Sequence, residues 1–302
     1  MARQGVEFRG LFGRRRHPGD VRVLVTGSRG FLGGALCEAL RGRGDRVVEP
    51  AGDLQRPGAL DGLVADVAVH LAADSHMGAS VQDPVRVWQN NTATTLAVLE
   101  WARAAQPRPR VVLASSAHVY APSPGPRKET DVLAPRSPYG ATKMAAEALG
   151  CAYSASYGVD VVRVRPFNVY GPGQRPGFLV PDILRPLSVG NRPSLGDPRP
   201  RRDFTYLDDA VRFFLLACDR PEASGQAINL GSGAAHSVAD VAATACRVAG
   251  SRLEPSFRAP GSGDELVADI RRAADLLGWS PAVGLEEGLR RTWDSMRSEW
   301  NA

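Results

Sequence analysis

Three side chains in the middle of the chain are suited to moving a proton. Tyr139 and Lys143 are four residues apart, and Ser116 precedes them. If residues 137–157 form a helix, residues four apart lie on one face, so these two side chains would be neighbours. A lysine ammonium beside a phenol stabilises the phenolate and lowers the cost of moving the phenolic proton near neutral pH. The Ser116 hydroxyl could hydrogen-bond an oxygen that becomes a carbonyl during hydride transfer.

A glycine-rich turn near the N-terminus predicts a bound dinucleotide. The segment VRVLVTGSRGFLGG, residues 21–34, has the pattern of a strand, a turn and the start of a helix. In that arrangement the free N–H groups and the macrodipole of the helix favour a pyrophosphate. Gly27 permits the tight turn, Gly30 lets the backbone approach the phosphates, and Gly33 allows the helix to pack closely on the strand. Alone the pattern is weak, since any strand–turn–helix unit can use glycine.

Elements that could hold these residues follow one another regularly along the chain. The expected strands are 21–25, 46–49, 66–71, 110–115 and 159–164, and the expected helices follow the glycine turn and cover 84–105 and 137–157. Strands alternating with helices predict an α/β fold, a Rossmann-type doubly wound parallel sheet with right-handed crossovers. The nearly continuous apolar strands agree, because both faces of such a sheet are covered.

Beyond Pro166 the composition changes, and proline and glycine become dense between residues 171 and 200. Short strands are expected at 204–207 and 227–230, and helices at 208–218, 238–249, 270–277 and 285–300. Loops at the carboxyl edge of a sheet are where specificity for a ligand normally lies. We therefore expect a dinucleotide-binding domain over 21–166 and a smaller, loop-rich α/β substrate-binding lobe over 167–302, with some elements shared.

Composition narrows the class of protein. Of 302 residues, 43% are hydrophobic and 23% charged, which is ordinary for a soluble globular chain. No apolar run approaches the ~20 residues that a membrane span needs, and the start lacks the apolar region of a secretory signal. We therefore expect a cytoplasmic protein with no membrane partner.

The cysteines, histidines and arginines restrict the class of protein further. Four cysteines without a CxxC pair are expected to be buried reduced thiols, and the five histidines show no metal-ligand spacing, so no metal is expected. Residues 1–20 are expected to be a basic, disordered tail. Its cluster Arg14-Arg15-Arg16-His17 could touch nucleic acid or an anionic surface, but such runs are more often solvated, and nucleic acid is not an expected partner.

Taken in order, these motifs resemble the extended short-chain dehydrogenase/reductase family, which includes the nucleotide-sugar epimerases, dehydratases and reductases. The similarity runs from about Val21 to Trp300. It is carried by Thr26-Gly27-x-x-Gly30-x-x-Gly33, His70-Leu-Ala-Ala73, Asn91, Ser116, Tyr139-x-x-x-Lys143, Arg165-Pro-Phe-Asn168-Val-Tyr-Gly-Pro172, Arg202-Asp-Phe204, Asp208-Asp209 and Asn229-Leu-Gly-Ser-Gly233.

The resemblance implies roles for matching residues. Tyr139 would be the acid/base at a sugar hydroxyl, Lys143 would hold the nicotinamide ribose, and Ser116 would orient the reacting oxygen. Asn168 and Arg202 would bind the substrate pyrophosphate, the alternatives being a capped turn and a solvated arginine. Cofactor contacts are expected at Gly27, Arg29, Gly30, Phe31, Leu32, Gly33, Asp53, Leu54, Leu71, Ala72, Ala73, Tyr139, Lys143 and Pro166. Substrate contacts are expected at Ser75, Ser116, Ala117, His118, Asn168, Val180, Arg202 and Asp264.

Departures from the family pattern restrict the reaction. Dehydratases carry an Asp-Glu pair where this chain has Ala117 and His118, so 4,6-dehydration is disfavoured. In GDP-fucose synthase and GDP-mannose 3,5-epimerase the position of His118 is a catalytic cysteine, so His118 either shuttles a proton or packs beside the nicotinamide. The second base of GDP-fucose synthase falls near Phe178, which cannot transfer protons, and this counts against double epimerisation. The family's Arg-x-Gly-Asp reads Gly261-Ser-Gly263-Asp264, so Arg258 would replace the displaced arginine.

The nucleotide preference stays open between NAD and NADP, with NAD favoured. NAD-dependent members place an aspartate after the second strand; spacing puts it at about Ala51, so Glu49 or Asp53 would substitute. Arg29 matches the arginine of the Gly-x-Arg-Gly turn in GDP-fucose synthase, which uses NADPH. It either faces a 2′-phosphate or is a solvated turn residue.

The resulting prediction is an NAD-dependent epimerase that acts at C4 of a UDP-, dTDP- or GDP-hexose through a transient keto sugar. One acid/base, Tyr139, suffices, because the keto sugar is reduced again on its other face. The alternative is an NADPH-dependent reductase of a 4-keto-6-deoxy sugar nucleotide, which Arg29 and Ala51 favour. A remote alternative is a non-catalytic dinucleotide sensor or nucleic-acid-binding relative. The resemblance also implies a homodimer through the helices near 84–105 and 137–157.

Overall fold

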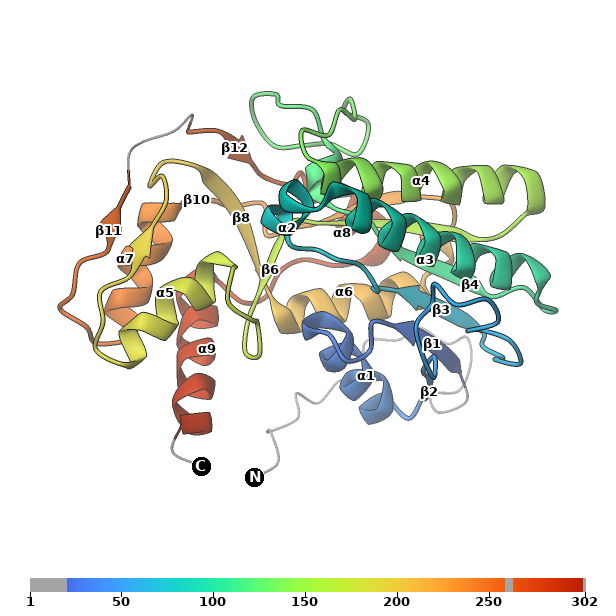
Figure 1. The fold of residues 1–302 in the computed structure, drawn as a ribbon, viewed down its shortest axis with the longest axis horizontal. Helices are drawn as coiled ribbons and strands as arrows, with labels where there is room; N and C mark the ends of the chain where they lie inside the picture. Colours follow the sequence, from blue (N-terminus) through green and yellow to red (C-terminus); the bar gives the residue numbers. More distant parts are fainter. Residues whose placement is uncertain (1–20, 259–262, 301–302) are drawn as a thin grey trace.

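The computed structural model describes residues 21–258 and 263–300. The expected basic tail, with Arg14–Arg16, lies outside the described residues, as does Gly261. Two parts are visible, a large parallel sheet between helices and a smaller lobe beside it (Figure 1).

Six parallel strands form the large sheet in the order β2-β1-β3-β4-β5-β9. The strands are β1 (Arg22–Thr26), β2 (Arg46–Val48), β3 (Val67–His70), β4 (Arg110–Ala114), β5 (Val161–Pro166) and β9 (Ala227–Leu230). The next strand in the chain after β1, which is β2, lies on one side of β1, and the later strands β3, β4, β5 and β9 lie on the other side. The direction of the strand order therefore changes between β1 and β3. In open α/β sheets a crevice for ligands forms at the carboxyl ends of the strands on either side of such a point.

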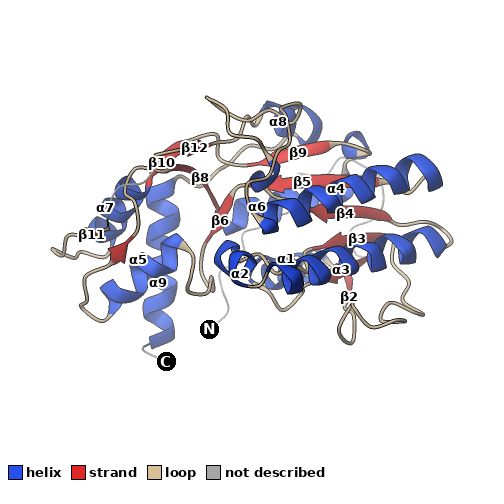
Figure 2. Cartoon of the chain, turned by 45° about the horizontal axis from the view of Figure 1, so that its top comes forward, coloured by secondary structure: helices blue, strands red, loops and turns tan. Residues whose placement is uncertain are grey.

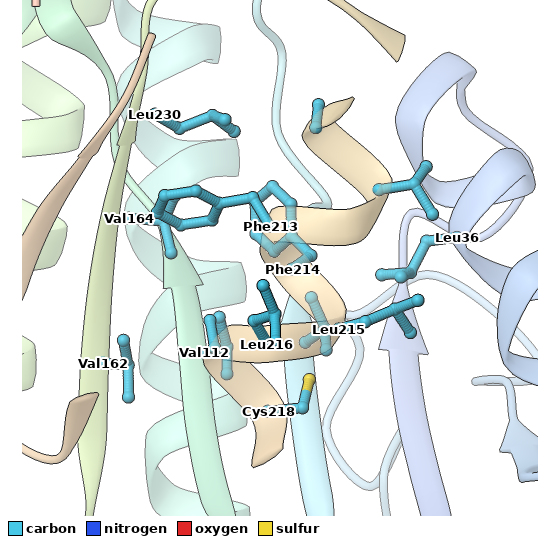
Figure 3. Packing of buried hydrophobic residues seen from close by; sticks show 14 of the residues in the cluster. Leu36, Val112, Val162, Val164, Phe213, Phe214, Leu215, Leu216, Cys218 and Leu230 are labelled. Atoms are coloured by element: carbon cyan, nitrogen blue, oxygen red, sulfur yellow. The ribbon is translucent and has the colours of Figure 1, made fainter. Parts of the chain in front are cut away.

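Helices cover both faces of this sheet, as alternation along β1 requires. Val23 and Val25 pack with α1 (Phe31–Arg43) and α6 (Leu207–Asp219). Leu24 packs on the other face in a cluster that includes residues of α3 (Pro84–Ala104) and α4 (Pro138–Tyr157). Figure 3 shows the rings of Phe213 and Phe214 lying between sheet residues such as Val164 and the α1 residue Leu36.

The smaller lobe is built around β8 (Arg201–Tyr206), which pairs with three short strands (Figure 2). These are β6 (Asn168–Tyr170) and β12 (Glu265–Leu266), parallel to β8, and β10 (Ala235–Ser237), antiparallel to it; β7 (Ser194–Leu195) and β11 (Ser256–Phe257) form a separate pair. Its helices are α5 (Leu179–Ser188), α7 (Val238–Val248) and α9 (Leu285–Trp300). The remaining helices are the short segments α2 (Met77–Gln82), α8 (Arg271–Leu277), η1 (Ala117–Val119) and η2 (Pro221–Ala223). A second apolar cluster holds α5, α7 and α9 together.

The predicted doubly wound parallel sheet is confirmed. The proposed boundary between 166 and 167 stays a prediction; β9 and α6 lie beyond it in sequence and belong to the large sheet and its covering layer. Cysteine burial is partly wrong, because Cys151 on α4 is exposed whereas the other three are buried. Among the described residues, no helix is both long and apolar enough to cross a membrane.

Helix α5 is an element that the sequence pattern did not predict. It carries Pro181 and Pro186 inside a stretch dense in proline and glycine. Pro181 lies in the first turn, where its missing N–H leaves no intrahelical bond unmade. Pro186 lies inside the helix and has no N–H to donate to the Asp182 carbonyl, so the composition of this segment is typical of a loop although it forms a helix.

Candidate active site

The turn between β1 and α1 has the backbone geometry that a pyrophosphate needs. Gly27 has φ +71°, and a Cβ there would lie 2.8 Å from the Ala72 amide nitrogen. A Cβ on Gly33 would lie 2.1 Å from the Gly27 carbonyl oxygen, so α1 packs directly on the turn. Gly30 is the N-cap, and the first turn of α1 holds no acidic side chain. The N-terminal N–H groups and the positive end of the helix dipole are therefore open to an anion.

A cavity of about 640 Å³ opens beside this turn. Six predicted cofactor residues line it: Gly27, Arg29, Asp53, Leu54, Ala72 and Ala73. Phe31, Leu32, Leu71 and Pro166 are not among the lining residues: the first three pack against the apolar core, and Pro166 ends β5. The volume lies in the usual range for cofactor sites. The residues present therefore fit a dinucleotide.

Carboxylates, which bind ribose hydroxyls, and cations, which bind a 2′-phosphate, both line this cavity. Ala51 and Asp53 line it, and so does Arg29. Glu49 is not among the lining residues, and its carboxylate accepts a hydrogen bond from Arg41 at 2.5 Å. Asp53 and Arg29 therefore both lie on the wall of this cavity, together with a second carboxylate, Asp74, and a second arginine, Arg175.

Buried polar groups hold the loop after β3 against the glycine turn. The Thr26 hydroxyl lies 2.8 Å from His70 Nδ1 and accepts a bond from the Ala72 amide at 3.2 Å. The other ring nitrogen of His70 lies 3.2 Å from the hydroxyl of Thr95 on α3. Asn91 on α3 accepts from the Asp74 amide at 2.8 Å. The His70-Leu-Ala-Ala73 motif is thus fixed from both sides.

We expect His70 to make the protein less stable in acid. Burial lowers the pKa of His70 to about 3, whereas an unfolded histidine titrates near 6.5. Between these values the unfolded chain binds a proton that the folded chain does not, so the free energy of unfolding falls as the pH falls below about 6.5, by up to about 1.4 kcal/mol per pH unit. His70→Gln should reduce this slope in urea titrations between pH 6 and pH 4. His236→Gln, at a half-exposed position on β10, is the control, and equal slopes in wild type and His70→Gln would contradict the prediction.

Tyr139 lies in the first turn of α4 and meets η1. Ser137 caps the helix by accepting from the Gly140 amide at 3.0 Å. A Cβ on Gly140 would lie 2.4 Å from the His118 carbonyl oxygen, so only glycine allows α4 to come this close to η1. Tyr139 is 8% exposed, and burial raises its pKa to about 12; the Asp74 charge acts in the same direction, while a hydrogen bond with Ser116 lowers it. The predicted neighbours Ser116 and Tyr139 are therefore brought together.

Lys143 lies one turn further along the same face. Its ammonium donates to the Ala114 carbonyl at the end of β4 at 2.8 Å and lies 6.0 Å from the centroid of the Tyr139 ring. Burial lowers the pKa of Lys143 to about 8, so its charge is held weakly near neutral pH. The i, i+4 spacing thus gives the predicted pair.

His118 lies beside Tyr139, with ring centroids 6.2 Å apart. Burial lowers its pKa to about 4; the Arg202 charge acts in the same direction and the Asp264 charge against it. His118 is therefore neutral at pH 7, and its surroundings disfavour the protonated form. Ala117 starts η1 and is buried.

A buried ion pair holds α4, the helix that carries Tyr139 and Lys143, against the sheet. Arg165 on β5 donates to both carboxylate oxygens of Glu147 on α4, at 2.8 and 2.7 Å. The same carboxylate accepts from Ser115, the neighbour of Ser116, at 2.5 Å. Arg165 also donates to the Tyr120 hydroxyl at 2.9 Å. The network ties α4 to the carboxyl ends of β4 and β5.

The predicted substrate residues lie in the smaller lobe and at its border. Arg202 donates to the Asp264 carboxylate at 2.9 Å, so two of them pair with each other. The Asn168 amide donates to the Asp203 carbonyl at 2.9 Å, which ties β6 to β8. Val180 in α5 is buried, and Ser75 is exposed after β3. His118 lies within electrostatic reach of Arg202 and Asp264, so these three are near one another.

Several residues at the site were not predicted. Ser28, Pro50, Gly52, Asp74, Asn90, Thr94 and Arg175 also line the dinucleotide cavity. Arg175 comes from the smaller lobe, and no local spacing pattern signals it. His76 also comes near this region, because its ring packs edge-on against Phe178 with centroids 5.9 Å apart. Phe178 itself carries no titratable group, as predicted.

The glycine turn, the parallel sheet and the Ser116–Tyr139–Lys143 group define a Rossmann-type nucleotide-dependent enzyme. The family model described as "NAD dependent epimerase/dehydratase family" matches residues 23–231. The chain belongs to this family.

Three named proteins similar to this chain are a curated relative and two solved structures. A UDP-glucose 4-epimerase of Mycolicibacterium smegmatis is 32% identical, over 92% of this chain and 99% of its own length. The structure of MoeE5 in complex with UDP-glucose and NAD is 32% identical with a TM-score of 0.84, and that of RMD from Pseudomonas aeruginosa complexed with NADPH is 26% identical with a TM-score of 0.85. For both structures, the matched region covers 92% of this chain and 99% of the other chain.

Proposed function

We propose that this protein is an NAD-dependent epimerase that inverts C4 of a nucleotide sugar, with a UDP-hexose as the first substrate to test. The observation that carries the proposal is the buried group of Ser116, Tyr139 and Lys143 at the carboxyl edge of the sheet that also holds the glycine turn. UDP-sugar 4-epimerases among the relatives support it.

The residues that would hold NAD are those around the large cavity. The glycine turn and the α1 N-terminus meet the pyrophosphate, and Asp53 meets the adenosine ribose. Lys143 would hold the nicotinamide ribose. When bound, NAD would supply reversible hydride transfer at C4 of the sugar.

Tyr139 removes and returns the proton of the C4 hydroxyl. Ser116 hydrogen-bonds to Tyr139, and the same hydroxyl can orient the sugar oxygen. The ammonium of Lys143 favours the phenolate that this step requires. His118 lies beside Tyr139 and is neutral, so it can relay a proton or simply close the site.

Arg202 and Asn168 would meet the substrate pyrophosphate, which would compete with Asp264 for the guanidinium. Val180 would pack against the nucleotide. Ser75, Ala117 and His118 would surround the sugar.

Two further proposals concern assembly and location. Exposed Trp88 and Leu96 on α3 and Met144 on α4 support a homodimer through these helices. We also propose that the protein acts in the cytoplasm, which its membership of the epimerase/dehydratase family supports.

The decisive prediction concerns the cofactor that the purified protein carries. An epimerase returns the hydride within one turnover, so NAD has no need to leave. We expect denatured protein to release stoichiometric NAD, measured by mass spectrometry. We also expect UDP-glucose deuterated at C4 to epimerise with the label retained. Protein that is empty and consumes NADPH with a 4-keto sugar nucleotide would instead establish the reductase.

A further inference from the structure

Asp203 is a fully buried acidic residue that the proposed mechanism does not use. It follows Arg202 directly on β8 and is 0% exposed, whereas the Arg202 side chain is 22% exposed. Successive side chains of a strand point to opposite faces, so Arg202 can meet a ligand while Asp203 points the other way. A buried carboxylate is costly unless hydrogen bonds compensate it, so its partners indicate its role.

Four hydrogen-bond donors surround the Asp203 carboxylate. Its Oδ1 accepts from the amide and the hydroxyl of Ser232, at 2.5 and 2.7 Å. Its Oδ2 accepts from the amides of Gly233 and Ala268, at 2.9 and 3.1 Å. Gly231 lets the loop after β9 come this close, because a Cβ there would lie 2.7 Å from Oδ2. Since every partner donates, the group that satisfies them all must accept on both of its atoms, which a carboxylate does and an amide does not.

The bond from Ala268 fixes the segment that carries Asp264. This segment pairs with β8 through the two residues of β12. Directly before β12, both the carboxylate and the carbonyl of Asp264 accept from the Arg202 guanidinium at 2.9 Å. Two residues after β12, the Ala268 amide donates to Asp203. A pairing of two residues fixes a segment weakly, so the Asp203 carboxylate helps to set where Asp264 and the Arg202 guanidinium lie.

From these contacts we propose that Asp203 is a positioning residue for substrate binding. Its carboxylate holds β12 in place, and β12 in turn orients the Arg202 guanidinium toward the pyrophosphate of the nucleotide sugar. The main-chain carbonyl of Asp203 also accepts from Asn168, the second proposed pyrophosphate contact, at 2.9 Å. This inference rests on the proposed function, in which Arg202 and Asn168 meet the substrate.

The proposal gives a role to two motifs of the sequence that the mechanism leaves unused. Asp203 belongs to the motif Arg202-Asp-Phe204, and its loop partners belong to Asn229-Leu-Gly-Ser-Gly233. The two motifs are thus the two halves of one contact. Asp203, Ser232 and Ala268 are not among the residues that line the dinucleotide cavity, so disturbing this contact should leave the cofactor in place.

Calorimetric titration of the purified holoprotein with a nucleoside diphosphate tests the proposal. UDP, dTDP and GDP are titrated into wild type, and the one that binds most tightly becomes the probe. Asp203→Asn keeps the size of the side chain but turns an NH₂ group toward donors. We expect the Kd of the probe to rise at least about tenfold, the lower range for losing a hydrogen bond to a charged group. Arg127 donates to the Glu265 carbonyl at 3.1 Å, so β12 should shift and not detach.

Steady-state kinetics of Asp203→Asn add a readout that a general loss of structure would not give. The pyrophosphate is remote from C4 of the sugar, so contacts to it are equal in the ground state and the transition state. The KM for the nucleotide sugar should therefore rise by about the same factor as the Kd, while kcat stays within about twofold of wild type. The NAD content should be unchanged.

Asp209→Asn is the matched control for stability. Asp209 is also a buried carboxylate, and it accepts from the amides of Ala282 and Val283 at 2.9 and 2.8 Å. These bonds tie α6 to the segment before α9. Asp209→Asn should melt at a lower temperature than wild type, as Asp203→Asn should, and yet bind the probe like wild type. Equal weakening of the probe by both variants would show that destabilisation alone is the cause and would overturn the proposal.

Two further variants complete the test. Ser232→Ala removes one of the four bonds, so it is the milder variant if Asp203→Asn does not fold, and it should weaken the probe about 2–5-fold. Arg202→Lys keeps a charge, so that binding remains measurable, but lacks the planar fork that Asp264 orients. In that background Asp203→Asn should weaken the probe by less than about twofold, because residues that act through one group are not additive.

Three results would contradict the proposal. They are additive losses in the double variant, unchanged probe affinity in both Asp203→Asn and Ser232→Ala, and failure of wild type to bind any of the three diphosphates. The proposed function is tested separately, because the titration needs no turnover. Wild type that binds the probe but does not epimerise UDP-glucose would contradict the epimerase and leave the positioning role of Asp203 standing.

Discussion

Replacing Tyr139 with phenylalanine should lower kcat by about 10²–10⁴-fold, the usual contribution of a positioned acid/base. The phenol is buried and hydrogen-bonded to Ser116. Phenylalanine keeps the ring and its packing against His118, so the fold and the cofactor cavity should persist. The measurement is epimerisation of UDP-glucose together with the amount of NAD released on denaturation.

Tyr157 supplies the matched control, since it lies on the same helix but is 46% exposed. Tyr157→Phe should retain wild-type turnover and wild-type NAD content. Full activity of Tyr139→Phe would remove this residue from the chemistry. Loss of bound NAD in the same variant would show instead that the substitution damages the cofactor cavity.

Local spacing predicted the parts of the site that lie on one element. Tyr139 and Lys143 share a face because a helix places residues four apart together, and the glycine turn follows β1 directly. The alternation of strands and helices likewise predicted the parallel sheet. Each of these inferences depends only on neighbours in sequence.

Contacts between distant segments could not be predicted in this way. Arg175 reaches the dinucleotide cavity from beyond β6, and His76 meets Phe178 across about 100 residues of chain. The pairing of Arg202 with Asp264 requires β12 to lie beside β8. Short strands such as β12 show no periodicity, because two residues are a single repeat of an alternating pattern and cannot show that it recurs. Residue type alone likewise could not show that Glu147, on the catalytic helix, is held by Arg165.

The second large effect should come from Gly33→Ala. The new Cβ would lie 2.1 Å from the Gly27 carbonyl oxygen, which is backbone and cannot rotate away. Either α1 moves off the turn or the turn opens, and both displace the N–H groups that would meet the pyrophosphate. Overpacking of this kind costs about 1–3 kcal/mol of stability.

Gly34→Ala is the matched control, because it makes the same substitution one residue further along α1. There the new Cβ would lie 3.5 Å from the nearest atom, an ordinary van der Waals contact. Alanine also favours a helix over glycine by about 1 kcal/mol, so Gly34→Ala should be as stable as wild type or more so. We expect Gly33→Ala to be purified without NAD and to melt at a lower temperature, whereas Gly34→Ala keeps both properties. Thermal unfolding with and without added NAD separates the two effects. If added NAD does not raise the melting temperature of Gly33→Ala, the substitution has damaged the dinucleotide site at the glycine turn, because a ligand stabilises only a state that binds it. NAD content and melting equal to wild type would mean that α1 does not need glycine at this position.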